Sequence, residues 1–286
     1  MLPKVFVLGA AKSGTTTLAR WLSQYDDVYV PEEKELHFFS NEKRYSLGLE
    51  FYSSFYQGNK ESITVDATPA YFHLPDILLP RLKEAYRPDQ LAQLKFIIVL
   101  RDPSERAFSH YKHRCRLLKE TRDFSQVITD EKKHKEWMNY VSDGFYAEQL
   151  SKWFNCFDKR QFLILITDEL KSDPENVLCR ISAFLKVKNS DVDLSESANA
   201  ASKPKSDVMM RFLTKPNFFK SCVKFFISEK ARKPVIEKLI RWNLSPEKKT
   251  TRLSKQDRAK LIQVYSNDID KLSEMLNRDL SKWKNL

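Results

Sequence analysis

Residues 4–17 read KVFVLGAAKSGTTT and decide how the chain begins to fold. Residues 4–8, a lysine followed by four apolar residues, are typical of a buried strand, and residues 15–25 carry apolar side chains at helical spacing. Between them lie Gly9 and Gly14, two of only five glycines in the 286-residue chain. Because glycine is scarce elsewhere, this pair predicts a loop whose backbone conformation other residues disfavour.

A strand, a glycine-bearing loop and a helix in this order form a common phosphate-binding arrangement, because loop N–H groups and the helix N-terminus attract anions. Lys12 lies inside the loop, two places before Gly14. In the nucleoside-triphosphate loop G-x-x-x-x-G-K-[ST], the lysine instead follows the second glycine. The loop therefore predicts a bound phosphate that carries a different group. The residues expected to hold it are Lys12, Ser13, Gly14, Thr15, Thr16 and Thr17.

Further short apolar runs occupy residues 63–66, 95–100 and 162–166, with helical patterns between and after them. Strands that alternate with helices predict a mainly parallel sheet covered on both faces. Near the end of the chain, Ser254 can cap a final amphipathic helix. We expect a single α/β domain over residues 1–286, with a P-loop-like central parallel sheet flanked by helices and a helical C-terminal portion. The other expected helices span residues 15–25, 75–86, 104–118, 174–185 and 212–227.

The net charge of +11 comes from 49 Lys and Arg against 38 Asp and Glu. Residues 201–286 hold 21 of the basic and 9 of the acidic residues, so the whole excess lies there. This excess indicates either a solvated basic surface or an anionic partner: nucleic acid, a membrane surface, a polyanion or a highly charged cofactor.

The four cysteines are widely spaced and form no CxxC pair, which indicates reduced thiols and neither a disulfide framework nor a zinc site. The longest apolar runs fall far short of the roughly 20 residues of a spanning helix. No signal-peptide pattern opens the chain. We therefore expect a cytoplasmic protein.

Four segments resemble the sulfotransferases that use 3′-phosphoadenosine 5′-phosphosulfate (PAPS), and most closely the branch with heparan sulfate sulfotransferases and their bacterial relatives. The loop around Lys12 resembles their 5′-phosphosulfate loop. Residues 35–39 (ELHFF) resemble the segment E-x-H-F-F, and residues 101–109 (RDPSERAFS) resemble the 3′-phosphate motif. Residues 144–174, which include GFY, DEL and DP, resemble the middle region of the family.

The residues themselves also predict a second anion site. The apolar run 95–100 ends in Arg101, and a helix pattern that includes Ser109 begins within three residues. An arginine fork with a hydroxyl suits a phosphate monoester. PAPS carries a phosphate cluster at each end of an adenosine, so the Lys12 loop and Arg101 can hold one end each.

The resemblance implies an in-line sulfuryl transfer in which Lys12 stabilises the leaving phosphate. It implies Glu35 as the base that takes the acceptor's proton. If this segment is extended, His37 lies on the same face as Glu35, where it could orient Glu35, contact the sulfuryl group or act as the base. The resemblance also points to Tyr146 as an adenine-stacking ring, to Ser202, Lys203 and Lys205 as further cofactor ligands, and to no metal.

The acceptor is expected to be a small molecule or a carbohydrate with a hydroxyl, amine or guanidinium nitrogen, and neither nucleic acid nor a membrane. The sequence leaves its identity and the oligomeric state open. Two other functions remain possible. One is a P-loop kinase or NTPase, and the other is a polyanion-binding protein without catalysis, whose binding would depend steeply on salt.

Overall fold

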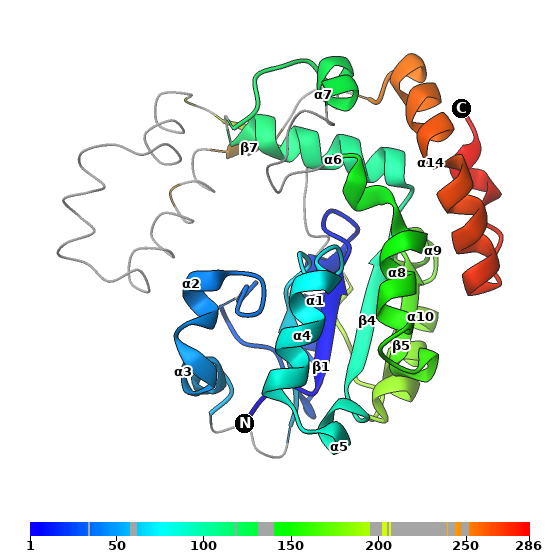
Figure 1. The fold of residues 1–286 in the computed structure, drawn as a ribbon. Coiled ribbons are helices and arrows are strands. Elements are labelled where there is room, and N and C mark those ends of the chain that lie inside the picture. The colour runs from blue at the N-terminus through cyan, green and yellow to red at the C-terminus, as the bar shows by residue number, and fades with distance from the viewer. Residues whose placement is uncertain are drawn as a thin grey trace.

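The computed structural model describes residues 1–33, 35–57, 62–117, 119–130, 140–194, 202–204, 206, 239, 244–246 and 252–286. A five-stranded sheet lies at the centre of this part of the chain (Figure 1). Its strands are β1 (Val5–Gly9), β2 (Val28–Tyr29), β3 (Ile63–Ala67), β4 (Lys95–Leu100) and β5 (Phe162–Ile166). Their order is β2-β3-β1-β4-β5, and every neighbouring pair is parallel, which confirms the predicted sheet.

Helices flank the sheet on both faces, as the sequence predicted. The larger ones are α1 (Thr15–Leu22), α4 (Pro75–Ala85), α6 (Pro103–Arg116), α8 (Tyr146–Phe154), α10 (Pro174–Leu185) and α14 (Lys255–Leu276). Shorter ones are α2 (Glu42–Tyr45), α3 (Gly48–Ser54), α5 (Pro88–Leu91), α7 (Phe124–Asp130) and α9 (Glu169–Ser172), with 3₁₀ turns at Ser142–Gly144, Lys159–Gln161 and Ser281–Lys284. Strands β6 (Ser202–Pro204) and β7 (Leu244–Pro246) form a separate antiparallel pair.

Alternation along β1 divides the core into two layers. Val5 and Val7 are buried with the apolar faces of α1 and α10. Phe6 and Leu8 are buried on the other side, with residues from α4, α8 and α14. Successive side chains of a strand point to opposite faces, so a strand covered on both sides must be apolar throughout. This is why residues 5–8 read as a continuous apolar run.

Helix ends follow the capping chemistry that the sequence contains. The side chain of Asp173 accepts a hydrogen bond from the Asn176 N–H at the start of α10. The Ser254 hydroxyl accepts one from the Asp257 N–H at the start of α14, as predicted. The expected helix over residues 212–227 lies outside the described residues.

Parallel strands bring several chain segments to one edge of the sheet. The loop of residues 10–14 follows β1, Pro69 comes soon after β3, Arg101 follows β4, and Thr167 follows β5. In open α/β sheets, ligands bind in the crevice at the carboxyl ends of the strands. We therefore expect the binding site at this edge of the sheet.

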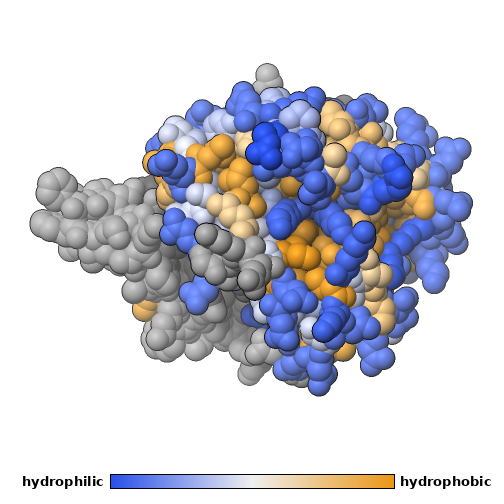
Figure 2. All heavy atoms as spheres, turned by 90° about the horizontal axis from the view of Figure 1, so that it is seen from below, coloured by the Kyte–Doolittle hydropathy of each residue, from blue (hydrophilic) through white to orange (hydrophobic). Residues whose placement is uncertain are grey.

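The described surface seen from below in Figure 2 is largely hydrophilic, with apolar areas between the charged side chains. Among large apolar side chains, Leu47 is 54% exposed and Ile77 is 41% exposed. Within the residues that the structure describes, no helix is both long enough and apolar enough to cross a membrane.

Candidate active site

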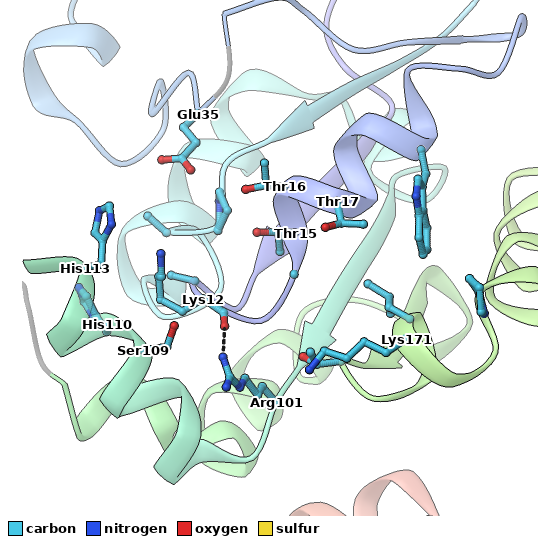
Figure 3. A pocket seen from close by; sticks show the side chains of 18 of the residues that line it. Lys12, Thr15, Thr16, Thr17, Glu35, Arg101, Ser109, His110, His113 and Lys171 are labelled. Carbon is cyan, nitrogen blue, oxygen red and sulfur yellow. Dashed lines mark hydrogen bonds between the residues drawn. The ribbon is translucent and has the colours of Figure 1, made fainter. Parts of the chain in front are cut away.

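A cavity of about 790 Å³ opens at the carboxyl edge of the sheet (Figure 3). Its volume lies within the usual range for small-molecule and cofactor sites. It receives residues from the β1–α1 loop, from the segment after β3, from α6 and from the segment after β5. The lining residues are Ala11, Lys12, Gly14, Thr15, Thr16, Thr17, Trp21, Glu35, Pro69, Ala70, Arg101, Ser109, His110, His113, Arg116, Thr167, Leu170, Lys171, Pro174 and Leu194.

The β1–α1 loop takes a conformation that requires glycine at both of its ends. Gly9 has φ of 152°, and a Cβ there would lie 2.6 Å from the carbonyl oxygen of Pro69. Gly14 has φ of 101°. The Ala10 N–H donates to the Val99 carbonyl of β4 at 2.8 Å. This tight fit explains why scarce glycines occur together here.

Helix α1 begins at the cavity without a side-chain cap. Its N-cap residue is Gly14, which offers no side chain to accept a hydrogen bond from the first turn. Thr15, Thr16 and Thr17 of that turn all line the cavity and add hydroxyl groups. First-turn N–H groups carry partial positive charge and need acceptors, so this end of α1 suits a bound anion.

The charge of the cavity is strongly positive. Lys12, Arg101, Arg116 and Lys171 line it, whereas Glu35 is the only carboxylate among the described lining residues. Burial lowers the pKa of Lys12 to about 8, and the nearby cations Arg116 and Arg101 add to this, while Glu35 opposes it. A phosphate would relieve the repulsion among these cations.

Arg101 joins the second predicted anion site to the first. Its Nη1 lies 3.4 Å from the carbonyl oxygen of Lys12 (Figure 3). Its Nη2 pairs with Glu105 at 3.2 Å. Asp102 caps α6 by accepting from the Ser104 N–H at 2.9 Å. Ser109, two turns into the helix, faces the same cavity. The structure therefore places Lys12, Arg101 and Ser109 together, as the sequence predicted.

The Asp102 carboxylate also receives a cation from the C-terminal helix. Arg258 of α14 donates from Nη2 to its Oδ2 at 2.7 Å. Asp102 thus links α6, which carries Ser109, to α14.

Glu35 lies at the edge of the cavity, and its side chain is 53% exposed. The His37 Nε2 is 3.6 Å from the Glu35 Oε2, and the His37 Nδ1 is 3.1 Å from the Ser40 hydroxyl. The segment is not extended, which was the condition for the predicted shared face, because Glu35 has φ of 55° and His37 has φ of 51°. His37 contacts the carboxylate but is not among the residues that line the cavity.

Two predicted cofactor ligands lie elsewhere, and both predictions are corrected. Tyr146 is 1% exposed, and its ring contacts Phe72 and Trp283 in the core, so no face is open to an adenine. The Ser13 side chain is fully buried and does not line the cavity. The Ser13 carbonyl instead accepts a hydrogen bond from Thr167 Oγ1 at 2.7 Å, which ties the loop to the segment after β5.

The remaining predicted ligands lie in residues 202–205, of which the structure describes residues 202–204. Ser202 and Lys203 belong to β6, which contacts α6, and the structure describes only their backbone. Lys205 lies outside the described residues. Their contact with a cofactor stays a prediction.

The structure adds cavity residues that the sequence reasoning missed. On α6, His113 and Arg116 lie one and two turns beyond Ser109, and the His113 Nδ1 is 2.7 Å from the Arg116 Nη2. Burial, with Lys12 and Arg116 nearby, lowers the pKa of His113 to about 3, so it is neutral. Figure 3 shows His113 and Lys171 at opposite ends of the cavity. His113 and Arg116 follow Ser109 by four and seven residues, and this spacing, which places all three on one face of a helix, could have indicated them from the sequence.

An apolar group also lines the cavity. Trp21 of α1 lies one turn beyond Thr17, and Leu170, Pro174 and Leu194 complete the group. Trp21 is only 4% exposed, so it contributes to an apolar wall of the cavity together with these aliphatic side chains. In the described part of the chain, no three His, Cys, Asp or Glu side chains are grouped as metal ligands.

Comparisons with known proteins agree with this geometry. A family model described as a sulfotransferase domain matches residues 2–232. Heparan sulfate glucosamine 3-O-sulfotransferase 5 of Mus musculus is 28% identical over 191 residues, which cover 64% of this chain and 53% of that protein. Bifunctional heparan sulfate N-deacetylase/N-sulfotransferase 1 of Caenorhabditis elegans is 30% identical over 201 residues, which cover 64% of this chain and 22% of that protein.

The chain therefore spans about half or less of the length of these curated relatives. Among solved structures, a sulfotransferase from Alicyclobacillus acidocaldarius superposes with a TM-score of 0.71 at 24% identity. The superposition covers 100% of both chains, so the likeness in fold extends over the whole length.

Proposed function

The chain belongs to the sulfotransferase family, and on this premise we propose that it transfers the sulfuryl group of PAPS to a hydroxyl or nitrogen acceptor. One observation carries the proposal: a single cavity holds both anion sites, the Lys12 loop and the Arg101–Ser109 pair. A nucleotide with a phosphate at each end needs two such sites. The uncapped start of α1 and the surplus of cations fit such a highly anionic ligand.

In the proposed complex, the β1–α1 loop and the first turn of α1 hold the 5′-phosphosulfate. Arg101 and Ser109 hold the 3′-phosphate, and Trp21 with its aliphatic neighbours receives the adenine. When bound, the cofactor supplies the activated sulfuryl group. Lys12 stabilises the charge that grows on the leaving phosphate oxygen, which is the electrostatic role that usually dominates such transfers.

The acceptor loses its proton as it attacks, and we propose that the Glu35 carboxylate takes it. Glu35 lines the cavity beside Lys12, whereas His37 lies behind it and contacts its carboxylate. This arrangement favours His37 as the residue that orients Glu35. The relatives' names describe transfer to heparan sulfate glucosamine. For this chain we propose a carbohydrate or small molecule as the acceptor.

An acceptor screen with PAPS tests this function. A panel with a desulfated heparin oligosaccharide, a phenol and a guanidinium compound is incubated with the enzyme. Mass spectrometry should find a gain of about 80 daltons, one SO₃ group, on at least one acceptor, because the enzyme lowers that barrier selectively. Added EDTA should not stop the reaction. ATP turnover that EDTA abolishes would favour a kinase or NTPase instead.

Arg101→Ala is expected to weaken binding of the product adenosine 3′,5′-bisphosphate by about 10- to 100-fold, the usual cost of a lost charged hydrogen bond. Calorimetry measures the Kd. Arg87→Ala is the control, because Arg87 pairs with Asp89 on the surface and does not line the cavity. An unchanged Kd with an altered KM for the acceptor would contradict the assignment to the 3′-phosphate.

Binding of adenosine 3′,5′-bisphosphate should weaken as the pH rises above about 8. The pKa of Lys12 in the free protein is about 8, so at higher pH the amine is neutral and must gain a proton to meet the phosphate. Affinity should therefore fall up to about tenfold per pH unit between pH 8 and 9.5. Calorimetry on Lys12→Met should lack this slope, and the same slope in that variant would assign it to another group.

A further inference from the structure

A buried carboxylate lies behind the segment that carries Glu35. Asp66, on β3, is fully buried and accepts three hydroxyl hydrogen bonds. Thr68 donates to its Oδ1 at 2.6 Å, while Tyr52 and Tyr71 donate to its Oδ2 at 2.6 and 3.1 Å. Burial raises the pKa of Asp66, and these three hydrogen bonds oppose the rise.

Two of the three hydroxyls also hold the backbone of the neighbouring segment. The His37 N–H donates to Thr68 Oγ1 at 3.4 Å, and the Phe39 N–H donates to the Tyr71 hydroxyl at 3.2 Å. A hydroxyl has one hydrogen, so each of these groups accepts from the backbone and donates to Asp66. The carboxylate thereby fixes the direction of both hydroxyls.

The held segment has a conformation that needs outside support. Glu35 and His37 both lie in the left-handed region of backbone conformation, with φ of 55° and 51°. Such a conformation is unfavourable for residues other than glycine and persists where the surroundings enforce it. One of the two backbone hydrogen bonds is made by the N–H of His37 itself, and the other by the N–H of Phe39, two residues further along.

We propose that Asp66 is a positioning residue that, through the hydroxyls of Thr68 and Tyr71, holds residues 35–39 so that the Glu35 carboxylate faces the cavity. This inference rests on the proposed function, in which Glu35 is the base. It adds a role for a group that touches neither cofactor nor acceptor. A base displaced by about 1 Å loses much of its effect, because proton transfer depends steeply on geometry.

Tyr52 provides a matched control within the same cluster. Its hydroxyl donates to Asp66 at 2.6 Å, as short as the hydrogen bond from Thr68. Its ring stacks on Phe38 with centroids 4.2 Å apart, a contact that phenylalanine would keep. Among the described residues, its hydroxyl makes no hydrogen bond to the backbone of residues 35–39. Tyr52→Phe therefore removes one hydrogen bond from Asp66 without releasing the segment.

The experiment compares Thr68→Val, Tyr71→Phe and Tyr52→Phe with the unchanged protein, and Thr68→Ser as a rescue that keeps the hydroxyl. Hydrogen exchange measured by mass spectrometry follows the amides of residues 35–39. Kinetics use PAPS with the best acceptor of the screen, calorimetry gives the Kd for adenosine 3′,5′-bisphosphate, and urea unfolding gives stability. Asp66→Asn is added if it folds.

We expect Thr68→Val and Tyr71→Phe to lower kcat by about 10- to 100-fold while the Kd changes less than about twofold. Their amides in residues 35–39 should exchange faster. Tyr52→Phe and Thr68→Ser should stay within about threefold of the unchanged kcat, with slow exchange retained. A loss of kcat in Tyr52→Phe equal to that in the other two would overturn the proposal, as would unchanged exchange in Thr68→Val and Tyr71→Phe.

Failure of the proposed function has a different signature. If Glu35→Gln keeps full turnover while Thr68→Val and Tyr71→Phe speed the exchange of residues 35–39, the segment is held as described, but Glu35 is not the base. If exchange stays slow and Glu35→Gln is inactive, Glu35 is the base, but Asp66 does not position it.

Discussion

Lys12→Met is expected to lower kcat by about 10²- to 10⁴-fold, the range seen when a preorganised charge is removed from a developing anion. Lys12 lines the cavity inside the β1–α1 loop, and its backbone carbonyl is fixed by Arg101. Methionine keeps the length and the apolar stem of the side chain but not the ammonium. Steady-state kinetics with PAPS measure the loss.

The fold should survive this change. Burial lowers the pKa of Lys12 to about 8, which means that the folded protein holds the charged amine less favourably than water does. At pH 7 the amine is charged in both states, so removing it relieves a cost of folding, and the melting temperature should stay equal or rise.

Lys171→Met is the matched control, because Lys171 lines the opposite end of the same cavity (Figure 3). Lys171→Met should raise the Kd for adenosine 3′,5′-bisphosphate, because a cation is removed from the cavity, and should leave kcat within a few-fold of that of the unchanged protein. Full turnover in Lys12→Met would remove Lys12 from the chemistry.

Glu35→Gln is expected to lower kcat by about 10²- to 10⁴-fold through loss of the general base, while the Kd for adenosine 3′,5′-bisphosphate changes little. The amide has nearly the same shape but cannot take a proton. Kinetics with the best acceptor and calorimetry with the product nucleotide provide the two measurements.

Two further variants separate the possible bases. Glu33 lies two residues before Glu35, pairs with Arg44 at 2.9 Å and does not line the cavity. The Glu33→Gln variant should therefore retain activity. His37→Asn should cost less than Glu35→Gln if His37 only orients the carboxylate. The reverse order would make His37 the base.

Local chemistry made much of the fold predictable. The loop between Gly9 and Gly14, the cap at Ser254 and the apolar run of β4 each depend on a few consecutive residues. These patterns specify strand, turn and helix without knowledge of distant neighbours. The placement of Lys12, Arg101 and Ser109 at one cavity followed, because parallel strands end at one edge of the sheet.

Predictions that depended on distant contacts were less accurate. Residues 35–37 are not extended, because their conformation is supported from Thr68 and Tyr71, about 30 residues further along the chain. Tyr146 was expected at the adenine, but its side of α8 packs into the core. Trp21 is part of the cavity only because Leu170 and Leu194, from other segments of the chain, lie beside it. The spacing of residues along one element does not specify which distant residues it contacts.

The hydrogen bond from Arg101 to the Lys12 carbonyl links the two predicted anion sites directly. The Arg101 guanidinium, which we propose binds the 3′-phosphate, also holds the backbone of the loop that we propose binds the 5′-phosphosulfate. A donor without the 3′-phosphate would thus leave the Lys12 side chain less firmly positioned. Recognition of the 3′-phosphate and reactivity at the sulfuryl group are then coupled. Selectivity for the complete donor is expressed in the rate of transfer as well as in the occupancy of the site.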